Sequence, residues 1–213
     1  MAAFFVFSLF LPFSLAVGYN SALSYYSMVK FEHKLTKRYL SASILSFESG
    51  SRQMLTRASV KSHLAESLWT ILPGNESSSE VVHQGDVVRC GDVIQLYHVT
   101  SKGYLHSHNF FSFLGRGYEI TSFNDKDSGN LWTVKCEGEF PGYGHPLQLQ
   151  HVNNRCHAAT ENSCQLPPQA GGEFELYCSL NTRGKEFDWI PTAGIFVDED
   201  EQDDREDDED EEL

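Results

Sequence analysis

The sequence lacks the motifs and long apolar stretches that mark catalytic and membrane-spanning chains. It contains no G-x-S-x-G elbow, H-E-x-x-H pair, P-loop or dinucleotide-binding glycine string, so we expect neither an enzyme nor a cofactor. The absence of a C-x-x-C pair argues against a zinc ribbon and a thioredoxin-like redox centre. After residue 16, no stretch is long and apolar enough to cross a bilayer, which takes about 20 residues.

Basic residues are also scarce, and the acidic excess is local. The chain has 16 Lys and Arg against 30 Asp and Glu, a net charge of −14. Residues 198–213 hold 13 acidic residues and one Arg, a net of −12, so the remainder carries only −2 (−14 minus −12). This tail should be disordered, because it repels itself and has little apolar surface to bury. The charge argues against nucleic-acid binding. Loose calcium binding by the tail stays open, although it has no EF-hand spacing.

The chain begins with the apolar segment MAAFFVFSLFLPFSLA, residues 1–16. Ser14 and Ala16 occupy the small-residue positions of a cleavage site, so we expect a signal peptide that is removed. Asn75 begins an N-glycosylation acceptor, Asn-Glu-Ser, as in a surface loop of a secreted chain. Five cysteines allow two bridges and one free thiol in an oxidising compartment, and the sequence leaves their pairing open. They are Cys90, Cys136, Cys156, Cys164 and Cys178.

One pattern occurs three times in the body of the chain. An alternating strand ends at His33, His98 and His151, a polar turn follows, and a tryptophan strand comes 36, 34 and 38 residues later, at Trp69, Trp132 and Trp189. A second strand of each unit is expected to begin at Tyr39, at Tyr104 and, less clearly, at Cys156. Such spacing predicts three copies of one hairpin-rich unit, an all-β fold with three-fold character. We expect the tryptophans in a shared core and the histidines in structural hydrogen bonds rather than a metal site.

The middle unit resembles a MIR repeat, and the chain resembles the stromal cell-derived factor 2 family. The likeness rests on Arg89-Cys90-Gly91-Asp92, on Leu105-His106-Ser107-His108 and on Leu131-Trp132-Thr133-Val134-Lys135-Cys136. It implies a β-trefoil of three MIR repeats, at residues 28–80, 82–140 and 141–196, and a Cys90–Cys136 disulfide. The resemblance gives no pairing for the other cysteines. A Cys156–Cys164 link, with Cys178 free, is one possibility.

The resemblance also implies a place and partners. Proteins of this family are expected in the lumen of the endoplasmic reticulum, beside a J-domain co-chaperone and a BiP-type chaperone, where they keep misfolded clients from aggregating. The last four residues, Asp210, Glu211, Glu212 and Leu213, resemble the K-D-E-L retrieval signal.

A lectin-like role is the alternative, because trefoils often bind sugars or glycans beside an aromatic ring. The second unit offers Tyr104, His106, His108, Asn109 and Phe110. The first and third units lack this histidine pair, so we expect one sugar site at most. His106 and His108 lie two residues apart and should share a strand face, but no third metal ligand is evident.

A chaperone partner instead needs an exposed apolar surface. The run from Phe110 to Leu114, which includes Phe111 and Phe113, fits either a core strand or such a surface, and the pattern does not choose between them. If Phe111 and Phe113 share an outward face, they are the candidate contacts.

Overall fold

The computed structural model describes residues 21–46, 50–61, 65–74, 81–168, 172–181 and 184–197. Several sequence-based expectations concern residues outside these ranges: the signal peptide at residues 1–16, the glycosylation acceptor Asn75, and the acidic tail with its terminal Asp210, Glu211, Glu212 and Leu213. Within the described ranges the regular structure is β-strands and short 3₁₀ turns, which confirms the all-β expectation. No helix among these residues is long and apolar enough to span a membrane.

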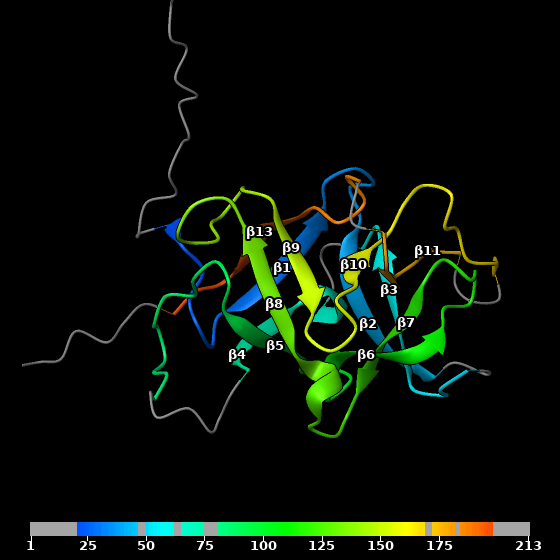
Figure 1. Cartoon of the computed structure of the whole chain (residues 1–213), viewed down its shortest axis with the longest axis horizontal. Coiled ribbons are helices and arrows are strands. Elements are labelled where there is room, and N and C mark those ends of the chain that lie inside the picture. The colour runs from blue at the N-terminus through cyan, green and yellow to red at the C-terminus, as the bar shows by residue number, and fades with distance from the viewer. Residues whose placement is uncertain are drawn as a thin grey trace, which may run out of the picture.

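Thirteen strands are described, and they form one sheet with antiparallel pairing (Figure 1). They are β1 Met28–His33, β2 Tyr39–Ser46, β3 Met54–Ser59, β4 Trp69–Pro73, β5 Val93–His98, β6 Gly103–Phe111, β7 Tyr118–Phe123, β8 Trp132–Cys136, β9 Leu147–His151, β10 His157–Ala159, β11 Phe174–Glu175, β12 Tyr177–Ser179 and β13 Trp189–Ile195. The period-two pattern is clear in β1, where Val29, Phe31 and His33 are buried and the residues between them are not.

The sheet closes on itself. Its strand order is β10-β12-β7-β6-β5-β8-β9-β13-β1-β2-β3-β11, with β10 also pairing with β9 and β7 with β3. Strand β13 pairs along β1, from His33 opposite Trp189 to Met28 opposite Ile195, so the two ends of the described chain lie side by side. Closure removes most exposed strand edges, which would otherwise invite aggregation.

The three tryptophans lie in the core, as predicted, and each makes the same hydrogen bond. All three are fully buried. The indole nitrogen donates to a carbonyl oxygen in the second strand of its own unit: Trp69 to Leu40 (2.9 Å), Trp132 to Leu105 (2.8 Å) and Trp189 to Ala158 (2.9 Å). Leu40, Leu105 and Ala158 are therefore counterparts. The third unit's strand begins at His157, one residue later than the predicted Cys156.

The three repeated histidines have structural roles, as predicted. Each is fully buried and packs against a tryptophan, with ring centroids 4.9–5.0 Å apart: His98 on Trp69, His151 on Trp132 and His33 on Trp189. Their Nδ1 atoms accept from the backbone N–H three residues on, at Thr36, Ser101 and Asn154. Each histidine thereby closes the polar turn that follows its strand.

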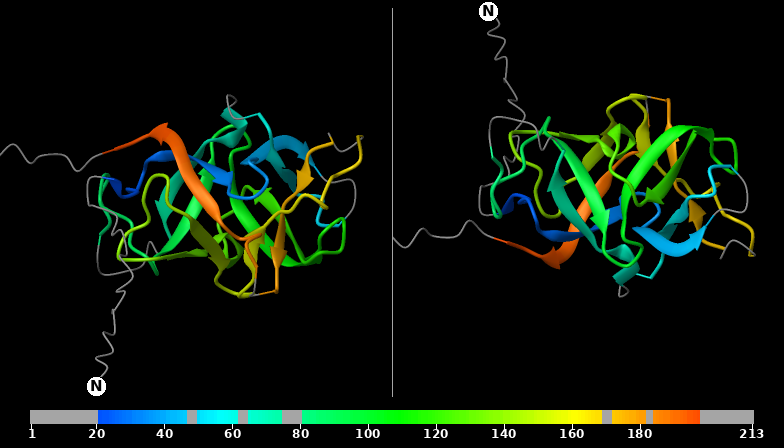
Figure 2. Two further views of the ribbon diagram at one scale, coloured as in Figure 1. Left: turned by 90° about the horizontal axis from the view of Figure 1, so that it is seen from above. Right: turned by 90° about the horizontal axis from the view of Figure 1, so that it is seen from below.

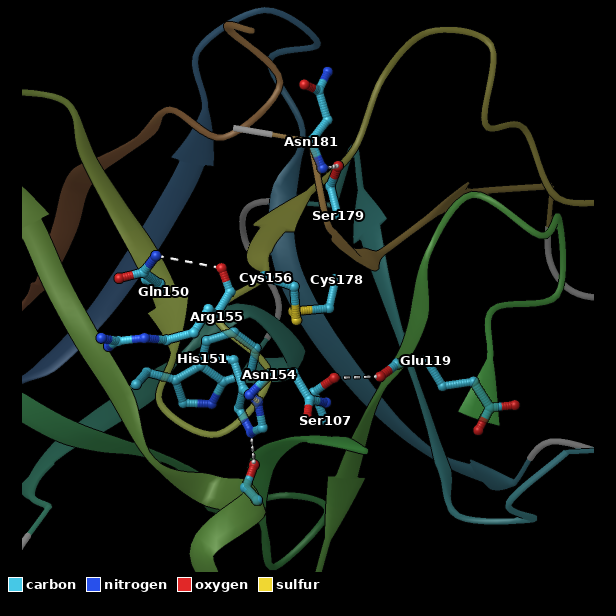
Figure 3. The surroundings of a disulfide bond; sticks show 12 residues. Ser107, Glu119, Gln150, His151, Asn154, Arg155, Cys156, Cys178, Ser179 and Asn181 are labelled. Atoms are coloured by element: carbon cyan, nitrogen blue, oxygen red, sulfur yellow. Dashed lines mark hydrogen bonds between the residues drawn. A yellow bond between two sulfur atoms is a disulfide. The ribbon is translucent and has the colours of Figure 1, made fainter. Parts of the chain in front are cut away.

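Two disulfides are present among the described residues. Cys90 and Cys136 are bonded, which is the bridge that the resemblance implied. The possible Cys156–Cys164 link is wrong, because Cys156 bonds Cys178 (Figure 3). Cys164 is a buried free thiol. Alternation along β12 explains the pairing: Cys178 faces the main core with Cys156, whereas its neighbour Tyr177 faces a separate small cluster that contains Cys164.

The hairpin ends gather at one end of the molecule. In Figures 1 and 2, the β6–β7 turn, the end of β2 and the start of β3 lie at the end of the molecule opposite the start of the described chain (blue) and its finish (orange-red). A partner bound at the hairpin end would therefore approach from the side away from both ends of the described chain.

Candidate functional site

The β6–β7 hairpin ends in an exposed apolar cluster, here called the aromatic tip: Phe110, Phe111, Phe113 and Leu114. Their exposed fractions are 51%, 75%, 56% and 36%. Of the two possibilities that the sequence left for this run, the structure confirms the exposed surface. Strand β6 is buried from Gly103 to Ser107, and its last three residues are exposed because they extend past the body of the fold.

Backbone hydrogen bonds shape the turn of the aromatic tip. The N–H of Ser112 donates to the carbonyl of Gly117 (2.9 Å), and the N–H of Gly115 donates to the carbonyl of Ser112 (2.8 Å). Gly115 has φ +69°, a conformation that glycine adopts without the cost that a Cβ adds. The phenyl ring of Phe111 stacks on Tyr118 across the hairpin, with centroids 6.0 Å apart. The aromatic tip is thus a hairpin end with a defined backbone conformation.

A second apolar pair lies at the same end of the molecule. Ile44 and Leu45, near the end of β2, are 71% and 63% exposed. Sequence reasoning missed them, although two adjacent apolar residues in an otherwise Ser-rich strand break the alternation of β2 and could have indicated an exposed hairpin end.

The inner part of the predicted second-unit set is buried and already occupied. Tyr104 packs against Tyr97 with ring centroids 5.1 Å apart. His106 lies 2.8 Å from Asn130 Oδ1 and 3.3 Å from Asp127, and its burial lowers its pKa. The side chains of Tyr104 and His106 therefore point into the interior of the fold. Of the predicted set, Asn109 and the three phenylalanines are exposed.

His108 connects the buried and exposed parts. Its ring lies 5.1 Å from that of His106, so the two share a face as predicted, and 4.9 Å from that of Phe110. Its Nε2 donates to Glu119 Oε2 at 3.2 Å. Burial alone would raise the pKa of the Glu119 carboxyl, but hydrogen bonds from His108 and Ser51 lower it. Within the described residues, no three His, Cys, Asp or Glu side chains converge as metal ligands.

Comparison with known proteins gives the chain a family. Human stromal cell-derived factor 2-like protein 1 is 30% identical over 158 residues, which covers 72% of this chain and 68% of the human protein. The chain belongs to the stromal cell-derived factor 2 family. No model in a scan of protein families matches it.

Two solved structures share the fold of this chain. The crystal structure of the SDF2-like protein from Arabidopsis thaliana superposes with a TM-score of 0.77 at 24% identity, covering 83% of this chain and 98% of that one. A chain of the S. cerevisiae protein O-mannosyltransferase Pmt1–Pmt2 complex bound to the sugar donor gives a TM-score of 0.70 at 18% identity. That match covers 83% of this chain and 26% of the yeast chain. At these identities, the likeness concerns the fold.

Proposed function

We propose that this family member is a non-catalytic chaperone partner in the lumen of the endoplasmic reticulum. In this proposal its body is a β-trefoil of three MIR repeats, at residues 28–80, 82–140 and 141–196. Its aromatic tip binds a J-domain co-chaperone, working with a BiP-type chaperone, or the misfolded clients that they handle. The proposal rests mainly on one observation, the exposure of Phe110, Phe111 and Phe113 at a single hairpin end.

Exposed phenylalanines at one place favour binding over chemistry. Contiguous apolar patches on a protein surface commonly mark sites of interaction, and aromatic anchors supply much of the energy of protein interfaces. The apolar members of the tip, such as Phe111 and Phe113, offer no acid, base or nucleophile. The position of the tip, away from both ends of the described chain, leaves it accessible.

The cellular location is supported by the cysteines and by the two ends of the sequence. Disulfides such as Cys90–Cys136 and Cys156–Cys178 form in oxidising compartments. The apolar residues 1–16 are proposed as the signal peptide, and the terminal Asp210, Glu211, Glu212 and Leu213 as the retrieval signal.

A cross-linked pull-down from lumenal extract tests the proposal, with the full chain as bait and Leu213 free at its terminus. The test variant is the pair Phe111→Ser and Phe113→Ser, and the control is Ile195→Ser. Ile195 is 59% exposed but lies on β13, near the end of the described chain. We expect the wild type and the control to recover a J-domain protein and BiP, and the double variant to recover neither. Recovery of no lumenal chaperone by the wild type, or full recovery by the double variant, contradicts the proposal.

Glycan binding is the second candidate function. Two observations favour it: the fold likeness to the mannosyltransferase chain and the contact of His108 with the exposed ring of Phe110. Asn109 and His108 are the test positions, because Tyr104 and His106 are buried and their loss would disturb the fold. A glycan array should give a signal that mannose displaces and that Asn109→Ala and His108→Ala remove. A blank array for the wild type excludes this function.

A further inference from the structure

Two buried glutamates occupy corresponding places in the second and third units. Leu105 and Ala158 are counterparts through their tryptophan hydrogen bonds, and they pair with Ser122 and Cys178 across their hairpins. Three residues before these partners lie Glu119 and Glu175. The same count in the first unit, where Leu40 pairs with Ala58, reaches Leu55. All three positions are buried, but only two carry a carboxylate.

Each of these glutamates accepts a backbone N–H from the hairpin end of the preceding unit. The N–H of Leu114, in the aromatic tip, donates to Glu175 Oε1 at 2.9 Å. The N–H of Ser51, which lies between β2 and β3, donates to Glu119 Oε2 at 3.3 Å. The second unit therefore holds the hairpin end of the first unit, and the third unit holds that of the second.

We infer that Glu175 is the positioning residue that holds the aromatic tip in its binding conformation, and that Glu119 holds the β2–β3 hairpin end in the same way. The inference rests on the proposed function of the tip. It adds that the binding surface is controlled from the third unit, through a residue that is buried.

Glu175 is fixed well enough to act as an anchor. Its own backbone N–H donates to the carbonyl of Cys164 (2.7 Å), and its carbonyl accepts from Thr160 Oγ1 (2.9 Å). In the sheet, Glu175 of β11 lies opposite Arg57 of the antiparallel strand β3. Only 4% of the residue is exposed. These bonds fix the backbone of Glu175, and burial restricts its side chain, so the turn that bonds to it takes its position from the body of the fold.

Glu119 is also buried, and the backbone of the β2–β3 turn lies close to its carboxylate. A Cβ on Gly50, which has φ +68°, would collide with the Glu119 carboxylate. Glycine leaves room for this carboxylate, and it adopts the positive φ of this position without the cost that a Cβ adds. His108 donates to the same oxygen, Oε2, as the N–H of Ser51, so Glu119 joins the first hairpin to the second.

The physical need for such an anchor follows from the composition of the tip. Phe111 and Phe113 are mostly exposed to solvent, at 75% and 56%. Without a fixed backbone they gain free energy by folding down onto nearby apolar surface. An anchored turn keeps them extended and reduces the conformational entropy that a partner must remove on binding.

Amide hydrogen exchange in the full chain tests the anchor directly, without any partner. Glu175→Leu places in the third unit the residue that the first unit has at Leu55. We expect exchange at the Leu114 amide to speed up by about tenfold or more, because its hydrogen bond to the buried side chain of Glu175 is lost. Exchange at the Ser51 amide should stay unchanged. Glu119→Leu should show the reverse pattern, and Glu175→Gln, which keeps an acceptor oxygen, should largely restore slow exchange at Leu114.

Partner recovery is then measured with the same variants. Glu175→Leu should weaken recovery of the J-domain protein at least several-fold, while Phe111→Ser with Phe113→Ser should abolish recovery and leave exchange at Leu114 slow. Unchanged exchange at Leu114 in Glu175→Leu overturns the inference, as does undiminished recovery by that variant. If the wild type recovers no partner, the proposed function fails, and the exchange experiment still decides whether Glu175 sets the conformation of the tip.

Discussion

The indole nitrogen of Trp132 donates a hydrogen bond to the carbonyl oxygen of Leu105, 2.8 Å away in the core. The bond joins the last strand of the second unit to the strand that begins its hairpin. Trp69 and Trp189 make the same connection in the first and third units. Each tryptophan therefore closes its own unit as well as filling the common core.

Replacement of Trp132 by Phe should destabilise the fold by about 2–4 kcal/mol. The change removes the indole donor, leaves the buried carbonyl of Leu105 without its partner, and opens a small cavity. Urea unfolding measures the effect, and Trp69→Phe should give a loss of similar size if the two bonds are equivalent. An unchanged urea midpoint for Trp132→Phe contradicts this account.

The sequence predicts these tryptophans because their role depends on features that a single chain displays, namely spacing and alternation. The roles of Glu119 and Glu175 depend instead on hairpins of other units. The first unit has Leu55 at the same place, so the sequence shows no glutamate that repeats in all three units. Burial of Tyr104 and His106 and exposure of Phe110 were similarly hidden, because all lie on one continuous strand. Only the closed sheet shows where that strand leaves the core.

The pairing of Cys156 was out of reach of the sequence for a related reason. Cys164 is nearer to Cys156 in the chain, but it lies in the segment between β10 and β11, and its side chain packs in a different cluster from that of Cys178. Sequence distance alone favours the shorter loop, and strand alternation decides against it.

Acidification should destabilise the fold through its buried histidines. Burial lowers the pKa of His33 from 6.5 to about 4, and burial also lowers the pKa values of His98 and His151. Between these values the unfolded chain binds protons that the folded chain excludes, so stability is full above pH 6.5 and falls as the pH drops towards 4. His33 alone accounts for about 3 kcal/mol at most.

The measurement is the free energy of unfolding in urea at several pH values between 7 and 4.5. His33→Gln should lower stability at pH 7 and flatten the decline with acid, because one excluded proton is gone. His145→Gln, at an exposed position, serves as the control and should follow the wild type. A decline in His33→Gln as steep as that of the wild type means that this histidine does not carry the effect.

Cys164 should resist thiol reagents in the folded protein. It is buried, and burial raises the pKa of its thiol to about 11, which keeps the reactive thiolate scarce. Iodoacetamide at pH 8 should label it only after unfolding in denaturant without reductant. Peptide mass mapping should then find one alkylated cysteine, with Cys156 still joined to Cys178. Fast labelling of the native chain, or a label on Cys178, contradicts the pairing and burial described above.

Two glycines that flank Arg116 in the turn between β6 and β7 should respond differently to alanine. A Cβ on Gly117 would collide with the backbone carbonyl of Cys178, whereas a Cβ on Gly115 meets no atom within 4 Å. Gly115 has φ +69°, so Gly115→Ala should cost about 1 kcal/mol through backbone strain alone.

Gly117→Ala should cost more, about 1–3 kcal/mol from overpacking in addition to the loss of close strand contact. The carbonyl that it meets belongs to β12, which pairs with β7 through Tyr177 opposite Glu119. Separating these strands disturbs the junction of the second and third units, where Glu175 holds the aromatic tip. Gly117→Ala should therefore also speed amide exchange at Leu114, and Gly115→Ala should leave that exchange less affected. Equal urea midpoints for the two variants would mean that β7 can move away from β12 at no cost, which the buried pairing of Tyr177 argues against.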